Sequence, residues 1–74
     1  MERQTFINQM TERGYKLAPP SPTGNVTATK GNITVRFVPR ADYVVYIDTP
    51  TVTAIIRKDA TDAETLRMID GLTA

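Results

Sequence analysis

Cysteine, histidine and tryptophan are absent from this 74-residue chain, and serine occurs once, as Ser21 in a proline-rich stretch. The lack of cysteine excludes disulfides and thiolate metal sites together. The lack of histidine removes the commonest general base, so Ser21 has no imidazole to activate it as a nucleophile. The composition therefore predicts a protein that is not an enzyme and that uses no cofactor.

The remaining candidates for a metal site are carboxylates. Asp59, Asp62 and Glu64 lie close together, but calcium loops distribute their oxygen ligands over about a dozen residues around a glycine turn. Acidic residues at the start of a helix are stabilised by free amide groups and by the helix dipole. Asp42 and Asp48 flank a predicted strand in turn positions, where Asp forms local hydrogen bonds. We therefore expect no metal site.

A strong excess of one charge is also missing. The chain has nine Lys or Arg residues and eight Asp or Glu residues, which gives a net charge of +1. Dedicated nucleic-acid-binding domains usually carry a clear basic excess. Basic residues concentrate in residues 24–58 and acidic residues in residues 59–74, a distribution that internal complementarity and helix-end stabilisation explain. The charge balance does not favour nucleic acid as the main partner.

Long hydrophobic runs are lacking as well. The longest unbroken apolar run covers residues 43–47, whereas a membrane-spanning helix needs about 20 apolar residues. Residues 1–14 are polar and amphipathic, unlike a secretory signal with its basic start and apolar centre. The sequence therefore predicts a cytoplasmic protein with no membrane association.

The length predicts one small domain over residues 1–74. A domain of this size buries only roughly 60% of its unfolded surface, so its core is thin. Disulfides, structural metals and subunit association are the usual means of stabilising such domains. Because the first two are excluded, self-association is the one that remains.

Two helices are predicted at the ends of the chain. Phe6, Ile7 and Met10 recur at helical spacing within residues 2–13, and Gly14 follows where a helix-ending residue is favoured. A proline-rich connector over residues 18–24 separates this helix from the next elements.

The second helix is predicted over residues 61–71. Thr61 and Glu64 have the spacing of a capping box, and Gly71 marks the expected end. The apolar side of this helix carries Ala63, Leu66, Ile69 and Leu72.

Between the helices the hydrophobic period becomes two, which predicts four antiparallel strands over residues 25–30, 33–38, 43–48 and 51–57. Gly31-Asn32 is a typical two-residue hairpin turn. It pairs Val26 with Phe37 and Ala28 with Val35, so that the apolar side chains share one face. The predicted fold is α+β, a four-stranded antiparallel β-meander flanked by an N-terminal and a C-terminal α-helix.

The third strand is apolar at five successive positions, which is typical of a strand covered on both faces. Two-residue turns at Arg40-Ala41 and Thr49-Pro50 would place Phe37, Val44 and Tyr46 on one face. The opposite face then carries Val38, Tyr43, Val45, Ile47, Val52, Ala54 and Ile56. The predicted core comprises Val35, Phe37, Val44, Ile55, Leu66 and Ile69.

The two helices can cover one face together or one face each. In the first arrangement, the face that carries Val38, Val45 and Ile56 stays exposed. An exposed apolar patch of several hundred Å² usually marks an interface. We therefore expect a small non-catalytic binding module that acts as a homo-oligomer, such as a dimer, or against a protein partner. Small accessory or inhibitor proteins of phages and mobile elements are of this type.

The alternative function is nucleic-acid binding by strand-borne Arg and Tyr side chains, which contact phosphates and stack on bases in many single-strand binders. The candidate residues are Lys30, Arg36, Tyr46 and Arg57.

Overall fold

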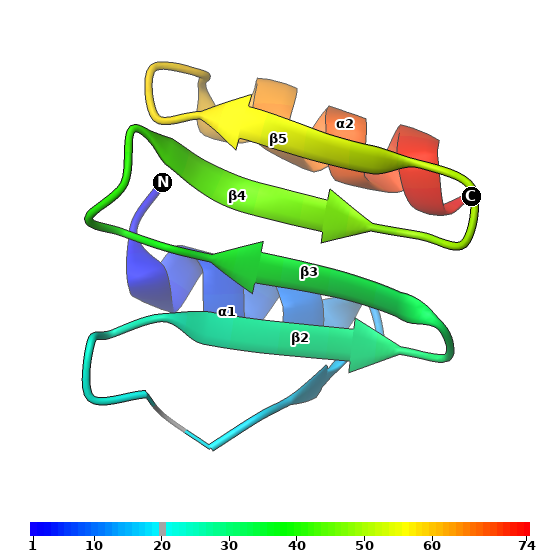
Figure 1. The fold of residues 1–74 in the computed structure, drawn as a ribbon, viewed down its shortest axis with the longest axis horizontal. Helices are drawn as coiled ribbons and strands as arrows, with labels where there is room; N and C mark the ends of the chain where they lie inside the picture. Colours follow the sequence, from blue (N-terminus) through cyan, green and yellow to red (C-terminus); the bar gives the residue numbers. More distant parts are fainter. Residues whose placement is uncertain (20) are drawn as a thin grey trace.

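The computed structural model describes residues 1–19 and 21–74, and of Tyr43 it describes the backbone alone. Pro20, which belongs to the predicted connector, lies outside the described residues. The elements in chain order are α1 (Arg3–Glu12), β1 (Lys16–Leu17), β2 (Val26–Lys30), β3 (Ile33–Phe37), β4 (Tyr43–Asp48), β5 (Thr53–Arg57) and α2 (Asp62–Thr73). The strands form one antiparallel meander in the order β1-β2-β3-β4-β5 (Figure 1). The predicted α+β class is confirmed.

The sheet has five strands rather than the predicted four. The additional strand, β1, pairs Lys16 with Thr29 and Leu17 with Ala28. The Ala18 amide extends this pairing by donating to the Thr27 carbonyl at 2.9 Å. A strand of two residues shows no periodicity of its own, so it depends on β2 as a template and has no signal in the sequence.

Helix α1 ends in the glycine motif that its sequence predicts. Gly14 has a φ of 82°, which a residue without a side chain adopts at no steric cost. Its amide donates to the Thr11 carbonyl, and the Tyr15 amide donates to the Met10 carbonyl, each at 3.0 Å. This is the Schellman pattern, which satisfies the last carbonyls of the helix. It also turns Tyr15 back into the core, where its ring is buried.

Helix α2 begins with the predicted capping box. The Glu64 amide donates to the Thr61 hydroxyl at 3.1 Å, and the Thr61 amide donates to the Glu64 carboxylate at 2.9 Å. The predicted end at Gly71 is wrong, because the helix continues to Thr73. The two extra residues include Leu72, which packs against the core, and this burial outweighs the roughly 1 kcal/mol that a helical glycine costs.

The β2–β3 hairpin has the predicted register, with Val26 opposite Phe37 and Ala28 opposite Val35. Gly31 has a φ of 59°, and no described non-glycine residue has a positive φ. A positive φ at the first turn residue alone is typical of a type II′ turn, which matches the twist of the flanking strands.

The β3–β4 register differs from the prediction by one residue. The structure pairs Phe37 with Val45, whereas a two-residue turn at Arg40-Ala41 would pair it with Val44. Such a turn needs a positive φ that neither Arg nor Ala readily adopts. The chain instead forms a longer loop, in which the Ala41 amide donates to the Val38 carbonyl at 3.2 Å. Pro39 is therefore the second residue of a four-residue turn that begins at Val38, a position where the fixed φ of proline is favourable.

A one-residue shift transfers every side chain of a strand to the other face. Val45 and Ile47 therefore join Val35 and Phe37 on one side of the sheet, and Tyr46 faces the other side. Val44 is the additional residue of an irregularity between Tyr43 and Val45, and it is buried as well. This bulge explains why β4 is apolar at successive positions without being covered on both faces.

The β4–β5 loop is also longer than predicted. The Thr49 amide donates to the Val52 carbonyl at 2.8 Å, and the Thr49 hydroxyl accepts from the Val52 amide at 2.9 Å. Val52 is therefore a loop residue, and β5 begins at Thr53. The pairing shifts by two residues, to Ile47 opposite Ala54, so each β5 side chain keeps its predicted face relative to β4.

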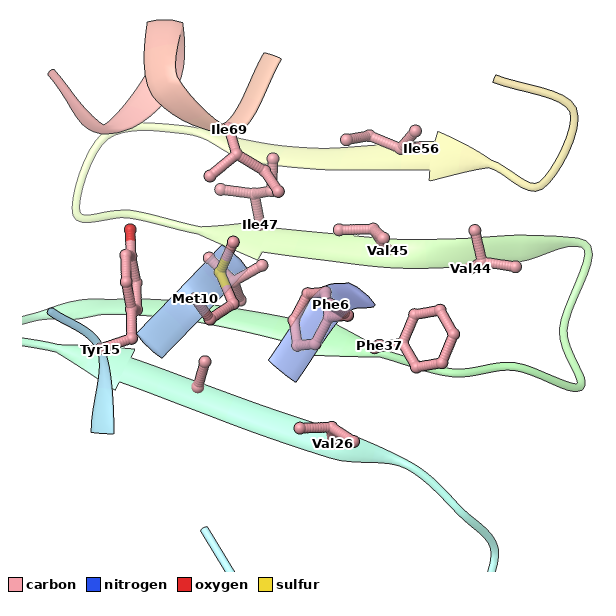
Figure 2. Close-up of a cluster of buried hydrophobic side chains, with 12 residues drawn as sticks. Phe6, Met10, Tyr15, Val26, Phe37, Val44, Val45, Ile47, Ile56 and Ile69 are labelled. Atoms are coloured by element: carbon pink, nitrogen blue, oxygen red, sulfur yellow. The ribbon is translucent and has the colours of Figure 1, made fainter. Parts of the chain in front are cut away.

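Both helices lie on the same side of the sheet (Figure 1). Phe6 and Met10 of α1 and Ile69 of α2 are fully buried against it. The rings of Phe6 and Phe37 stack with centroids 5.3 Å apart, and Figure 2 shows these side chains between helices and strands. Thr65 is buried too, and its hydroxyl donates to the Thr61 carbonyl at 3.0 Å.

The predicted apolar interface is wrong as an exposed surface, because its centre forms the core. Val45 and Ile47 are 0% exposed and Ile56 is 2% exposed under the two helices. Val38 and Ala54 are partly buried, Val52 is exposed in the loop, and the side chain of Tyr43 lies outside the described residues.

Most of the predicted core is confirmed. Val35, Phe37, Val44 and Ile69 are buried, and Leu66 packs partly buried against them. The prediction that Ile55 belongs to the core is wrong, since its side chain is 49% exposed on the opposite face.

The register of β4 can be tested by placing one carboxylate at either of two neighbouring positions. We expect Val45→Glu to unfold the chain, because burying an unpaired carboxylate costs several kcal/mol in a domain whose total stability is about 5–15 kcal/mol. Tyr46→Glu is the matched control and should leave the fold intact, because Tyr46 faces away from the helices. Circular dichroism of both variants measures this. A folded Val45→Glu would contradict the register.

An ion pair joins the C-terminal ends of the two helices. Arg13 Nε lies 2.7 Å from Asp70 Oδ1, and Arg13 Nη2 donates to Asp70 Oδ2 at 3.0 Å. These hydrogen bonds hold the pKa of Asp70 below its ordinary value of 3.8. The pair links the C-terminal end of α1 to the last turns of α2, at points 57 residues apart in the sequence.

We expect Asp70→Asn to lower the melting temperature near neutral pH. The loss should be at most about 1 kcal/mol, because exposed ion pairs contribute little. A carboxylate with a depressed pKa stabilises the folded state above its unfolded pKa, and this stabilisation disappears as the pH falls through the folded value. The difference between wild type and Asp70→Asn should therefore be full at pH 7 and vanish in acid below 3.8. A difference that is independent of pH would show that Asp70 acts through packing instead of charge.

Candidate functional site: the open face of the sheet

The side of the sheet opposite the helices carries no other element among the described residues (Figure 1). We call this side the open face. Strand alternation and pairing place on it Thr27 and Thr29 of β2, Thr34 and Arg36 of β3, Tyr46 and Asp48 of β4, and Thr53, Ile55 and Arg57 of β5. All of these side chains are exposed or half-buried. A surface rich in threonine with one aromatic, one aliphatic and two guanidinium groups is suited to binding.

Arg36 and Tyr46 form the centre of the open face. The two residues are direct cross-strand neighbours on β3 and β4. The guanidinium carbon of Arg36 lies 5.4 Å from the centroid of the Tyr46 ring, a distance at which cation–π attraction contributes about 0.5–1 kcal/mol at exposed sites. This contact restrains both side chains before any partner binds. Ile55 lies opposite Tyr46 on the next strand and continues the row to the sheet edge.

A hollow of about 220 Å³ lies beside this pair. Its lining consists of Thr27, Thr34, Arg36, Tyr46, Ile47, Asp48 and Thr53. The Thr53 hydroxyl donates to Asp48 Oδ1 at 2.7 Å and fixes the carboxylate at one end of the hollow. Pockets that enclose small-molecule ligands usually measure about 300–1,000 Å³. The hollow therefore suits a single inserted side chain better than a whole ligand.

The described residues of the open face include no hydroxyl paired with a histidine as an activating base. Its hydroxyls belong to threonines, and the chain has no histidine to activate them. Asp48 and Asp42 stand at opposite ends of β4, and five strand steps separate Tyr43 from Asp48, roughly 17 Å. They cannot act together as a carboxylate pair. Within residues 1–19 and 21–74, no three His, Cys, Asp or Glu residues are grouped closely enough to hold a metal ion.

Of the acidic residues near α2, Glu64 is engaged in helix capping. Glu64 accepts from the backbone and the side chain of Thr61, and these interactions lower the pKa of its carboxyl group. Asp62 lies beside it in the first turn. This is the capping role that the sequence favours over metal binding.

The residues of the nucleic-acid alternative divide between the two sides of the sheet. Arg36 and Tyr46 meet on the open face and Arg57 lies on the same side, but Lys30 lies on the helix side. Lys30 Nζ donates to the Arg13 carbonyl at 2.8 Å and sits 5.1 Å from the Tyr15 ring centroid, at the C-terminal end of α1. A cation at that position stabilises the helix dipole. Arg57 ends β5 at the edge of the sheet.

Sequence reasoning found part of the open face. The alternation in β2 and β3 correctly puts Thr27, Thr29, Thr34 and Arg36 together. It missed Tyr46 and Ile55 as members of the same surface, because their face depends on the β3–β4 loop. The signal was available in the residue types of that loop, since Arg40-Ala41 is a poor two-residue turn.

No protein-family model matches the chain, and no curated protein or solved structure is significantly similar to it. Of the helices in the described residues, none has the length and apolar character needed to cross a membrane.

Proposed function

We propose that this protein is a small non-catalytic interaction module that binds another protein through the open face of its sheet. The observation that carries the proposal is the placement of Arg36 and Tyr46 side by side at the centre of an uncovered sheet, 5.4 Å apart. Tyr and Arg are enriched among the residues that dominate protein–protein binding energies. An accessory or inhibitor protein of phage or mobile-element type would have this organisation.

Two further features support a protein partner. The contact between Arg36 and Tyr46 restrains long side chains, so less conformational entropy is lost when a partner binds. The surrounding threonines offer hydroxyls for hydrogen bonds and little charge. A surface of this kind suits another folded protein, and its hollow of about 220 Å³ can receive one side chain of that partner.

The proposal predicts that a double variant, Arg36→Ala with Tyr46→Ala, loses its partners while it stays folded. We expect proteins retained from a lysate of the encoding organism to fall roughly tenfold or more, because truncating central interface residues costs about 2 kcal/mol. The readout is mass spectrometry of proteins captured on immobilised chain.

The matched control is Arg3→Ala with Arg67→Ala, which removes two exposed residues from the helix side. This control should retain the same proteins as wild type. Circular dichroism must show native spectra for both double variants. Equal retention by wild type and the open-face variant would mean that the open face is not the binding surface.

Nucleic acid is the second candidate partner, and the same Arg36–Tyr46 pair favours it, since a base can stack on Tyr46 while Arg36 contacts phosphate. It is second because Lys30 lies on the other side of the sheet and Asp48 places a negative charge beside the pair.

Titration of labelled single-stranded DNA and RNA at low salt separates the two partners. If the partner is a protein, we expect no complex by fluorescence anisotropy. A complex that weakens steeply with added salt, and further with Arg36→Ala, would replace the protein proposal with nucleic-acid binding. A complex that is unaffected by Arg36→Ala would place nucleic acid elsewhere on the molecule.

A further inference from the structure

The outer edge of β5 is the least protected part of the molecule. β5 is the last strand of the sheet, and no described strand pairs with its outer side (Figure 1). The opposite edge ends in the two-residue β1, which is followed by Pro19. Short edge strands and prolines prevent edge-to-edge association, as do lysines within the strand. β5 has five residues, Thr53-Ala54-Ile55-Ile56-Arg57, with neither proline nor lysine.

The hydrogen-bonding groups that β5 presents outward follow from the antiparallel pattern. The Thr49 amide donates to the Val52 carbonyl, so Thr49 and Val52 form a hydrogen-bonded pair. Such pairs alternate along an antiparallel ladder. Thr53 and Ile55 therefore direct their amide and carbonyl groups away from β4, toward the outer edge. These groups are a template for one further antiparallel strand.

The exposed apolar residues gather around the same edge. Among the described residues, four large hydrophobic side chains remain exposed, namely Leu17, Val52, Ile55 and Met68. Val52 immediately precedes β5, and Ile55 is its central residue. Only Leu17 belongs to the opposite edge.

Met68 adds an apolar group on the helix side of this edge. It precedes Asp70 by two residues on α2, so the two side chains point about 200° apart around the helix. Asp70 faces α1 through its ion pair with Arg13. Met68 therefore projects from the flank of α2 away from α1, on the side of β5, where it is 43% exposed.

We propose that two copies of this chain pair through their β5 edges, antiparallel and centred on Ile55, to form one continuous ten-stranded sheet. In this register Ile55 lies opposite Ile55 of the second copy on the open face. Ala54 lies opposite Ile56 of the second copy on the helix side. The two Met68 side chains approach one another below them, so apolar groups close both sides of the new strand pair.

The charges of the edge are complementary in the same register. Thr53 lies opposite Arg57 of the second copy, and Asp48 lies one strand inward from Thr53 on the same face. The backbones of Asp48 and the second Arg57 are then about 10 Å apart, a span that the two side chains bridge together. The two-fold axis repeats this placement of opposite charges at the other end of the edge. A second copy of the chain thus matches the edge in backbone, apolar groups and charge.

This pairing at the β5 edge does not depend on the partner proposed for the open face. It would join the open faces of the two copies into one surface of twice the extent and would leave that surface uncovered. It also supplies the subunit association that a small domain without disulfides would gain from. Stabilisation comes from the main-chain hydrogen bonds and from the burial of Ile55 and Met68.

The test is the mass in solution of wild type, Ile55→Lys and the matched control Thr29→Lys, by size-exclusion chromatography with light scattering. Thr29 is an exposed residue of the same face on β2, away from the β5 edge. We expect wild type and Thr29→Lys at twice the monomer mass of 8.2 kDa, and Ile55→Lys at the monomer mass. Two lysines would meet on the axis in Ile55→Lys, and lysine is a natural protector of edge strands.

Amide hydrogen exchange of wild type by NMR tests the pairing without any substitution. The Ile55 amide should be protected at high protein concentration and lose that protection on dilution, while the amides paired between β3 and β4 stay protected. This measurement also shows whether two copies pair through β5 if the Ile55→Lys variant fails to fold.

Three results would overturn the proposal. They are a monomeric wild type at high concentration, a folded Ile55→Lys that stays dimeric, and a dimer whose Ile55 amide exchanges as rapidly as in the monomer. The double variant Arg36→Ala with Tyr46→Ala should remain dimeric. Loss of its captured partners with an intact dimer separates the open face from the edge, so either proposal can fail alone.

Discussion

The pairing of Phe37 with Val45 is the contact on which the rest of the structure depends. It sets which side of β4 faces the helices, and through β4 it orients β5. With this register Val45, Ile47 and Ile56 enter the core, and Phe37 stacks on Phe6 of α1. A slip of one residue would bury Tyr46 and expose Val45, because the side chains of a strand alternate. The five-residue loop before β4 therefore determines the inside and the outside of the molecule.

Placing both helices on one side of the sheet has two consequences. The apolar side chains of α1, α2 and the sheet form a single core, which suits a chain too short to build two. The other side is left to threonines and to the Arg36–Tyr46 pair, whose hydroxyl, phenol and guanidinium groups tolerate water. Arg13 and Asp70 link the helices at their C-terminal ends. The molecule is therefore a two-layer structure in which the helices cover one face of the sheet and the other face stays open.

The two edges of the sheet are unequal. β1 and the proline that follows it end the sheet on one side, whereas β5 presents unprotected backbone groups beside Val52, Ile55 and Met68 on the other. Exposed apolar side chains beside a free strand edge are a liability in a monomer and an asset in a symmetric dimer. A two-fold axis on Ile55 would leave the open faces of both copies accessible, so association at the edge and binding at the face are compatible.

The sequence by itself determined the α+β class, both helices with the end of α1 and the start of α2, and the β2–β3 hairpin. These features depend on local chemistry: the glycine after α1, the Thr61–Glu64 box, and the Gly31-Asn32 turn. The absence of histidine and cysteine from the composition is the basis for expecting a non-catalytic module, which stays a prediction. Only the tertiary structure decided the faces of β4 and β5, the extra strand β1, and the gathering of Arg36, Tyr46 and Ile55 on one surface. The physical reason is that the pairing with neighbouring strands decides which side chains of a strand are buried and which are exposed. The register of β4 depends on a loop conformation, and the bulge at Val44 buries two successive residues that periodicity assigns to opposite faces.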